Sequence, residues 1–383
     1  VLTANVAVLV QGEKISGIGS PVPKDAAIID LSKYTCLPGL IDSHTHILLQ
    51  PEDEEGAPPV VVKSQDFRTV QGVAAAKKEL EAGFTTLRDV DSEGAGFADV
   101  AIRDAINKGI IPGPRLFVAT LALSITAGHM NLHGVNPYLS LPEPSALVDS
   151  KDAMIAEVRR QVKYGADWIK LYATGTLRHV DEKTLEPMSQ VSLEEVRAVV
   201  NEAARWRKDV AAHAYGGEGA KNSILGGVRS IEHGMLMDDA TIDLLVKHGT
   251  YWCPTLSVYI VRKKEDDTEV RRRIIAHHKD VFRKAMAKGV KIAFGTDVGA
   301  YEHGTSAQEF ERMVAYGMKP IDAIRSATLR GAELLRIENQ IGTIEPGKFA
   351  DIIAVQGNPL QDIGALKNVS FVMKAGRVYK QPQ

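Results

Sequence analysis

The sequence predicts an α/β protein built as a TIM-type (β/α)8 barrel, with a small β-sandwich formed by the N- and C-terminal segments. Three observations favour this fold. Short apolar strands alternate with amphipathic helical stretches through most of the 383 residues, a pattern typical of a parallel sheet. Glycines stand at the junctions between helical stretches and strands. The two ends are rich in short strands, and neither alone has enough apolar surface to form a core.

Eight predicted strands form the barrel. Each is a short apolar run, and most are separated from the next by a helical stretch. A doubly wound open sheet is the structural alternative, but no GxGxxG or Walker-type phosphate loop follows the first strand. The strands are Cys36–Asp42, Thr85–Val90, Arg115–Thr120, Trp168–Ala173, Asp209–Ala214, Arg229–Glu232, Thr250–Leu256 and Lys291–Gly295.

Local signals mark the helix boundaries. Ser192 and Glu195 have the spacing of a capping box at the start of one helix. Glycine readily adopts the left-handed conformation that ends a helix. It precedes four of the predicted strands, at Gly83, Gly165, Gly249 and Gly289.

The two strand-rich ends are best explained together. We expect residues 1–36 and 341–383 to form one β-sandwich domain and residues 37–340 to form the barrel. Two polar insertions, Gln50–Lys63 and Gly175–Gln190, follow the first and fourth strands. In a barrel both insertions lie on the catalytic face.

Composition argues against some classes of partner. Charged residues make up 25% of the chain and the formal net charge is −2, so nucleic acid is not expected to bind. No apolar run approaches the length of a membrane span. Cys36 and Cys253 do not make a disulfide framework and are expected as core thiols. The first residue is Val1, so a cytoplasmic location and, after removal of a signal peptide, a periplasmic or secreted one both stay open.

Six side chains of the kind that bind divalent metals stand at or near the C-terminal ends of five predicted strands, where barrel enzymes keep their active sites. A lone histidine in a strand is more often a core residue than a ligand. Chance, however, rarely places six candidates at the same end of successive strands. The candidates are His44, His46, Lys170, His213, His233 and Asp297.

Lys170 needs a separate explanation, because it lies inside an apolar strand. A buried ammonium is costly, and lysine is almost never fully buried without a partner. Its neutral amine is able instead to react with CO₂ and form a carbamate. Such a carbamate is an anionic bridge suited to two cations.

Several segments together resemble the amidohydrolase superfamily, in particular its binuclear members with a carboxylated lysine. The matching segments are Leu37–His46 (LPGLIDSHTH), Ile169-Lys170, His213–Tyr215 (HAY), Ser230–Gly234 (SIEHG), Gly295–Asp297 (GTD) and Gly342–Asp351 (GTIEPGKFAD). The resemblance implies two divalent metal ions, with zinc the expected metal. By this resemblance His44, His46 and Asp297 hold the more buried ion, His213 and His233 hold the more exposed one, and carboxylated Lys170 bridges both.

The expected mechanism follows from the charge of the two ions. Cations about 3.5–4 Å apart lower the pKa of a shared water and supply hydroxide near neutral pH. Asp297 is expected to accept a proton from that water and pass it to the leaving amine. The resemblance to prolidase-like dipeptidases, carboxypeptidase-like enzymes and ochratoxin hydrolases assigns His129 and Tyr215 to the tetrahedral centre, where they would stabilise the oxyanion.

Substrate contacts are harder to predict. Arg178 and His179 lie in the insertion after the fourth strand and are candidates to pair with a substrate carboxylate, although solvated loop charges are the commoner role. Tyr259 follows the seventh strand and is expected to line the pocket. His278 lies on a helical stretch and is expected on the surface.

The sequence therefore predicts a metal-dependent hydrolase that cleaves the amide bond of dipeptides or N-acyl amino acids. One alternative is a cyclic-amide hydrolase or deaminase of the imidazolonepropionase type, but such enzymes typically use one metal and lack the lysine ligand of strand four. The other is a non-catalytic scaffold relative, but such proteins lose ligands and here all six are present. The expected partners are a small-molecule or dipeptide substrate and further copies of the chain, because the superfamily often forms homo-oligomers.

Overall fold

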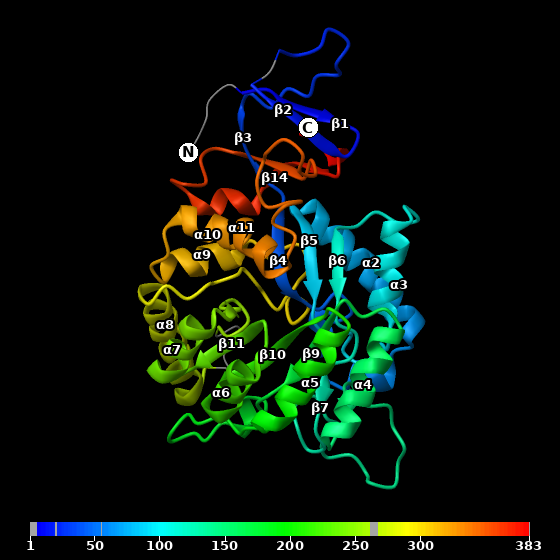
Figure 1. The fold of residues 1–383 in the computed structure, drawn as a ribbon, viewed down its shortest axis with the longest axis vertical. Helices are drawn as coiled ribbons and strands as arrows, with labels where there is room; N and C mark the ends of the chain where they lie inside the picture. Colours follow the sequence, from blue (N-terminus) through cyan, green and yellow to red (C-terminus); the bar gives the residue numbers. More distant parts are fainter. Residues whose placement is uncertain (1–5, 20, 55, 261–266, 383) are drawn as a thin grey trace.

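The computed structural model describes residues 6–19, 21–54, 56–260 and 267–382. Parallel strands and helices make up the larger part of the molecule, and the strands from the two chain ends gather at one end of it (Figure 1). Parallel strands buried on both faces need helices on the outside, which matches the predicted alternation of strand and helix. The α/β class predicted from the sequence is confirmed.

The parallel strands form two hydrogen-bonded groups. The first has three strands in the order β4-β5-β6, and the second has six in the order β12-β11-β10-β9-β7-β8. Every strand pair within these groups is parallel. The strands are β4 (Leu40–Thr45), β5 (Phe84–Asp89), β6 (Arg115–Val118), β7 (Leu123–Ser124), β8 (Ala146–Leu147), β9 (Trp168–Tyr172), β10 (Asp209–Gly216), β11 (Ser230–Leu236) and β12 (Tyr251–Cys253).

Backbone hydrogen bonds join the two groups on both sides. On one side the amide of Asp167, just before β9, donates to the carbonyl of Val118 in β6 at 2.8 Å. On the other side residues 291–298 lie between β12 and β4. The amide of Trp252 donates to the carbonyl of Lys291 at 2.9 Å. The amide of Ser43 donates to the carbonyl of Phe294, also at 2.9 Å.

The predicted eighth strand, Lys291–Gly295, is wrong as a regular strand, because only Ile292 forms a single parallel bridge to Trp252. Just beyond it, a side chain shares the backbone bonding, because the amide of Thr296 donates to the carbonyl of His44 at 3.3 Å and also to a carboxylate. The carboxylate of Asp42 accepts from both the amide of Thr296 and its hydroxyl, at 3.2 and 2.6 Å. The next residue, Asp297, has a left-handed backbone with φ 62°. The backbone is therefore turned away from strand geometry where the site begins.

The first predicted strand, Cys36–Asp42, is two strands in two different sheets. β3 (Tyr34–Pro38) pairs antiparallel with β13 (Ile352–Gln356), whereas β4 pairs parallel with β5. Gly39 separates them, and its amide donates to the carbonyl of Asp351 at 2.8 Å. A Cβ at Gly39 would collide with the side chain of Thr85, so only glycine fits at this crossing.

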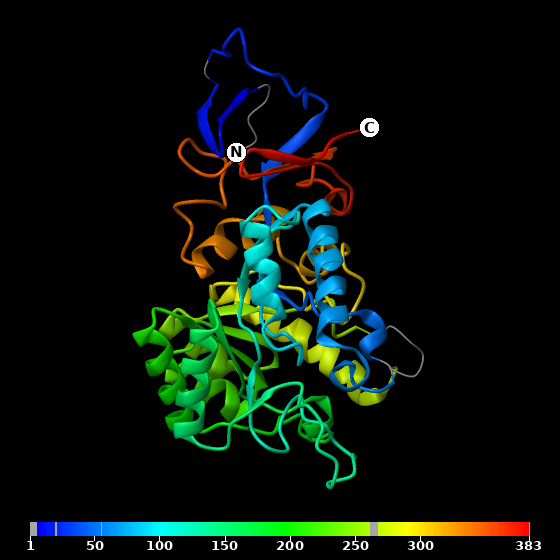
Figure 2. The same ribbon diagram turned by 90° about the vertical axis from the view of Figure 1, so that its right-hand side faces the viewer.

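The two ends of the chain share a sheet. β3 lies at the edge of a four-stranded sheet with the order β15-β14-β13-β3. The other three strands come from the C-terminal segment: β13, β14 (Val369–Lys374) and β15 (Arg377–Lys380). A separate antiparallel pair, β1 (Val8–Gln11) and β2 (Lys14–Ile18), packs its apolar side chains with those of this sheet. Figure 2 shows this arrangement from the side, with both ends of the chain above the α/β part.

Five of the described α-helices begin at a residue whose side chain caps the helix with a hydrogen bond. Ser64, Ser150, Asp238 and Thr268 each accept from a backbone amide in the first turn, and Ser192 and Glu195 form the predicted capping box. The predicted glycine stops are also confirmed, since all four have positive φ. The α-helices are α1 (Pro59–Val62), α2 (Gln65–Glu81), α3 (Ala98–Asn107), α4 (Lys151–Lys163), α5 (Leu193–Arg205), α6 (Gly217–Gly226), α7 (Asp239–His248), α8 (Glu269–Ala287), α9 (Gln308–Ala315), α10 (Pro320–Ser326) and α11 (Leu329–Leu334). The short 3₁₀ helices are η1 (Pro51–Glu54), η2 (Leu177–His179) and η4 (Ile363–Lys367).

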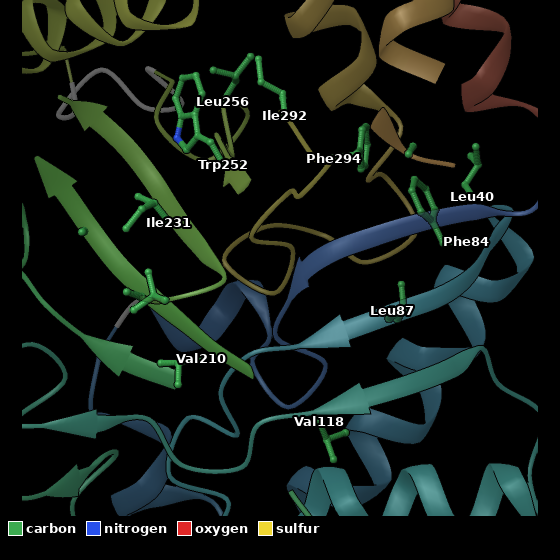
Figure 3. Packing of buried hydrophobic residues seen from close by; sticks show 14 of the residues in the cluster. Leu40, Phe84, Leu87, Val118, Val210, Ile231, Trp252, Leu256, Ile292 and Phe294 are labelled. Carbon is green, nitrogen blue, oxygen red and sulfur yellow. The ribbon is translucent and has the colours of Figure 1, made fainter. Parts of the chain in front are cut away.

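Aromatic stacking helps to hold residues 291–298 in place, in addition to their few backbone hydrogen bonds to β12 and β4. Phe294 stacks on Phe84 of β5, with ring centroids 5.6 Å apart, and on Phe310 of α9 at 4.3 Å. Figure 3 shows Phe294 close to Phe84. Aromatic pairs of this kind add about 0.5–1.5 kcal/mol beyond the area they bury.

Two expectations about burial are corrected. Cys36 is exposed, because β3 alternates and turns Leu37 inward in its place, whereas Cys253 is buried as expected. His278 is buried on the inner face of α8, where its ring lies 6.2 Å from that of Trp252. None of the described helices is long and apolar enough to cross a membrane.

Candidate metal centre

The six predicted ligands lie around one cavity of about 820 Å³ at the C-terminal ends of the parallel strands. His44 is in β4 and His46 follows it. Lys170 comes from β9, His213 from β10 and His233 from β11. Asp297 follows the segment between β12 and β4. All but Asp297 are buried residues.

Four of these side chains converge closely. The Nε2 atoms of His44 and His46 are 3.3 Å apart. Oδ1 of Asp297 lies 3.2 Å from Nε2 of His46 and 3.5 Å from Nε2 of His44. One potential ligand atom from each of His44, His233 and Asp297 lies within 4.8 Å of the other two. This clustering of imidazole and carboxylate atoms fits a divalent metal ion.

Backbone strain accompanies the convergence. Both His233 and Asp297 have left-handed conformations, with φ of 71° and 62°. Such conformations in residues other than glycine cost of order 1–3 kcal/mol and persist where the surrounding structure demands them. Both strained residues are candidate ligands, which is where strain is expected to serve function.

The electrostatics of this cluster favour a positive charge. Burial disfavours the charged form of His46, but Asp297 and Glu93 overcome it and raise the pKa of His46 to about 10. For Asp297, burial again opposes the charge, and hydrogen bonds from His44 and His46 hold its pKa well below the usual range. The carboxylate of Asp297 therefore stays negatively charged beside two imidazoles, as a cation site requires.

His213 and Lys170 lack the partners that buried polar groups normally have. Nε2 of His213 is buried and has no hydrogen-bond partner in the described part of the chain. The ring of His213 lies 4.6 Å from that of His233. Lys170 forms no ion pair within residues 6–19, 21–54, 56–260 and 267–382, and burial lowers its pKa although Glu232 and Asp297 oppose the shift. Both side chains line the same cavity as the other candidate ligands.

Residues that the sequence did not single out hold the histidines in place. Glu232 accepts from Nδ1 of His44 at 2.7 Å and from Arg88 at 2.8 Å, with all three side chains fully buried. Nδ1 of His233 pairs with the hydroxyl of Thr255 at 2.8 Å. A hydrogen bond at Nδ1 fixes the tautomer and leaves Nε2 of His44 available as a ligand.

Glu232→Gln should lower metal affinity by about 10- to 100-fold, because partners of this kind orient the ligand and raise its basicity. Competition with a chromophoric chelator measures the affinity. Glu79→Gln is the matched control, since Glu79 is also a buried carboxylate but binds the 304–306 loop. Equal affinities in the two variants would show that Glu232 does not support the metal.

His129 and Tyr215 both reach the same cavity. The ring of His129 lies 4.1 Å from that of His213. Burial, followed by the charge of Lys170, lowers the pKa of His129 to about 3, so the imidazole is neutral at neutral pH. Tyr215 is buried with its ring 4.6 Å from that of His213, and its hydroxyl accepts from Tyr259 at 3.3 Å. Both are placed beside a candidate metal ligand.

The predicted substrate contacts divide. Tyr259 and Arg178 line the cavity, the first buried and the second exposed. His179 is not among the lining residues. Its Nδ1 accepts from the amide of Thr176 at 3.1 Å and closes the capping box of η2. Parts of both predicted insertions flank the cavity, including Pro58 and Leu177.

Comparison with known proteins identifies the family. The family model described as "Amidohydrolase family" matches residues 35–379. The chain is 30% identical over 413 residues to ochratoxinase of Aspergillus niger, covering 99% of this chain and 83% of the relative. A crystal structure of a Xaa-Pro dipeptidase with bound methionine is similar over 98% of this chain and 95% of its own, with TM-score 0.86 and 39% identity.

A third relative agrees with these two. The crystal structure of a prolidase complexed with N-methylphosphonate-L-proline covers 98% of this chain and 94% of its own, with TM-score 0.84 and 29% identity. The predicted resemblance is therefore confirmed. The chain belongs to the amidohydrolase family, as a hydrolytic enzyme that resembles the prolidases and ochratoxinase.

Proposed function

We propose that this enzyme is a metal-dependent hydrolase that cleaves the amide bond of dipeptides or N-acyl amino acids with a free carboxylate next to that bond. The observation that carries the proposal is the convergence of four histidines, Lys170 and Asp297 on one cavity that His129 and Tyr215 also line. The similarity to a Xaa-Pro dipeptidase, a prolidase and ochratoxinase supports an amide substrate of this kind.

In this proposal the parallel strands form a closed (β/α)8 barrel, and residues 291–298 complete the ring between β12 and β4. The hydrogen bonds on both sides of this segment support closure. It also takes residues 1–36 and 341–383 as a β-sandwich domain, supported by the pairing of β3 with β13. In such a barrel the strand ends that hold the histidines form the catalytic face.

Two divalent ions, with zinc expected, would fit the donor atoms of this cavity. His44, His46 and Asp297 would hold one, His213 and His233 the other, and Lys170 would lie between them as a carbamate. The carbamate forms when the neutral amine attacks CO₂ and releases a proton, which the burial of Lys170 favours. When bound, the ions would lower the pKa of a shared water and polarise the scissile carbonyl.

The side chains of the enzyme do the remaining work. Asp297 is ionised at neutral pH, so it is able to accept a proton from the attacking water and pass it to the leaving nitrogen. His129 and Tyr215 would donate to the carbonyl oxygen as negative charge develops there. The partial exposure of Asp297, 14% of its side chain, leaves room for water and substrate.

A substrate screen tests the proposal. The zinc-loaded enzyme is offered Xaa-Pro dipeptides, Xaa-Arg dipeptides and N-acyl aromatic amino acids, alongside lactams and aminated rings. We expect hydrolysis of members of the first three groups. Cleavage of lactams or aminated rings alone would overturn the proposal.

Tyr215→Phe should lower kcat by about 10²- to 10³-fold with little change in KM, because the lost donor acts mainly on the transition state. Steady-state kinetics on the best substrate measure both constants. Tyr251→Phe is the control, since Tyr251 is a buried tyrosine outside the cavity lining. Unaltered kcat in Tyr215→Phe would assign Tyr215 to the rim of the pocket alone.

A further inference from the structure

One cationic side chain on the cavity wall has no role in the metal centre. Arg271 lies in the first turn of α8 and lines the cavity together with Tyr215, Tyr259 and the candidate metal ligands. A guanidinium beside a site proposed to hold metal cations is repelled by their positive charge unless an anion lies close to it. The position of Arg271 therefore calls for an anion.

Within the described part of the chain that anion is missing. Arg271 forms no ion pair there, and its side chain donates one hydrogen bond to the described residues, from Nη2 to the carbonyl of Ile260 at 3.2 Å. Its Nε is buried and has no hydrogen-bond partner among the described residues. An unsatisfied donor on a buried guanidinium is costly, and a carboxylate is the ligand that its planar fork of N–H groups fits.

The neighbours of Arg271 connect it with the reacting end of the cavity. Burial raises the pKa of the Tyr259 hydroxyl, and Arg271 lies close enough for its charge to oppose that shift. Tyr259 in turn donates to Tyr215 at 3.3 Å, and the Tyr215 ring contacts His213. Arg271 thus lies on the side of the cavity that Tyr259, Tyr215 and His213 line.

Arg178 is the other arginine in the cavity lining, and it is less suited to the task. It is exposed on η2, and a pair between an exposed arginine and a carboxylate contributes little. Arg271 is partly buried, so water competes less with a bound carboxylate there.

We propose that Arg271 binds the carboxylate of the substrate and thereby makes the enzyme prefer substrates with a free carboxylate next to the scissile amide. This inference rests on the proposed function, since it names the group that selects the substrates of that site. Arg271 is a binding residue in this account and takes no part in proton transfer.

The test compares the best carboxylate substrate from the screen with its C-terminal carboxamide. In Arg271→Met, KM for the carboxylate should rise by about 10- to 100-fold, the loss expected for a charged hydrogen-bonded pair, while kcat changes little. Hydrolysis of the carboxamide should be the same in Arg271→Met and in the unmodified enzyme. Calorimetric binding of the free amino acid product should weaken by a similar factor, which measures the contact without catalysis.

Controls separate this contact from general damage. Arg272→Met changes the neighbouring position on α8, where Arg272 is exposed and paired with Asp267, and it should leave KM unchanged. Arg271→Lys keeps the charge without the planar fork and should give an intermediate KM, which also serves if Arg271→Met does not fold. Unchanged KM and product affinity in both Arg271 variants would overturn the assignment, as would the same loss appearing in Arg178→Met instead. An unmodified enzyme that cleaves no substrate with a free carboxylate would instead refute the proposed function itself.

Discussion

Replacing Lys170 with alanine is expected to lower amide hydrolysis by about 10³-fold or more and to remove at least one bound metal ion per chain. The loss is large because the variant has no group able to bridge two cations, and four imidazoles and one carboxylate then face two ions with little negative charge between them. Elemental analysis of the dialysed, zinc-treated protein and steady-state kinetics measure the two effects.

A matched lysine controls for the loss of a buried side chain. Lys374→Ala removes a half-buried lysine of β14, in the sheet formed by the chain ends. Its Nζ donates to the carbonyl of Gly113. This variant should keep its metal and its turnover. If Lys170→Ala does the same, the bridging role of Lys170 is wrong.

Asp297→Asn is expected to keep the fold but to lower kcat by about 10²- to 10⁴-fold, the range for a lost general base. Asparagine has the shape of aspartate and tolerates the left-handed backbone at this position, so the local structure should persist. The amide, however, cannot accept the proton. Circular dichroism, metal content and kcat measured on one preparation distinguish a lost base from a lost ligand.

The control for this variant is Asp239→Asn, at an exposed position in the first turn of α7. It should match the unmodified enzyme in all three measurements. Full turnover in Asp297→Asn would exclude Asp297 as the proton shuttle and would leave it as a ligand only.

The convergence of the six candidate ligands on one cavity could be predicted because two local rules combine. Residues two apart on a strand point the same way, which brings His44 and His46 together, and parallel strands end at a common edge, which brings in Lys170, His213 and His233. Neither rule depends on knowing which distant residues touch. The sequence was therefore sufficient to predict which strands carry the candidate metal ligands.

Two strand predictions failed because their outcome depends on distant partners. Gly39 divides the first predicted strand, since the chain crosses there from β13 to β5, and an apolar run gives no sign of such a crossing. The eighth predicted strand does not form a regular ladder with β4, because the amide of Phe294 donates to the carbonyl of Ser326 and the amide of Ile41 to that of Ala327. Apolar periodicity reports burial and does not report which backbone groups are already bonded.

The supporting residues were beyond prediction for the same reason. Glu232 stands one residue from a predicted ligand, but its partner Arg88 is 144 residues away in the chain. Arg271 lies in the first turn of a helix, in a charged stretch of the sequence that is typical of an exposed surface. Only the folded chain shows that it lines the cavity. A charged residue in a sequence reveals its role only when its surroundings are known.

The proposed metal centre is best tested by a crystal structure of the zinc-treated protein with anomalous scattering data. We expect two metal peaks about 3.5–4 Å apart, bounded by His44, His46, His213, His233 and Asp297, with density for a carbamate on Nζ of Lys170 between them. An unmodified Lys170 amine that points away from a cavity without metal peaks would contradict the proposal.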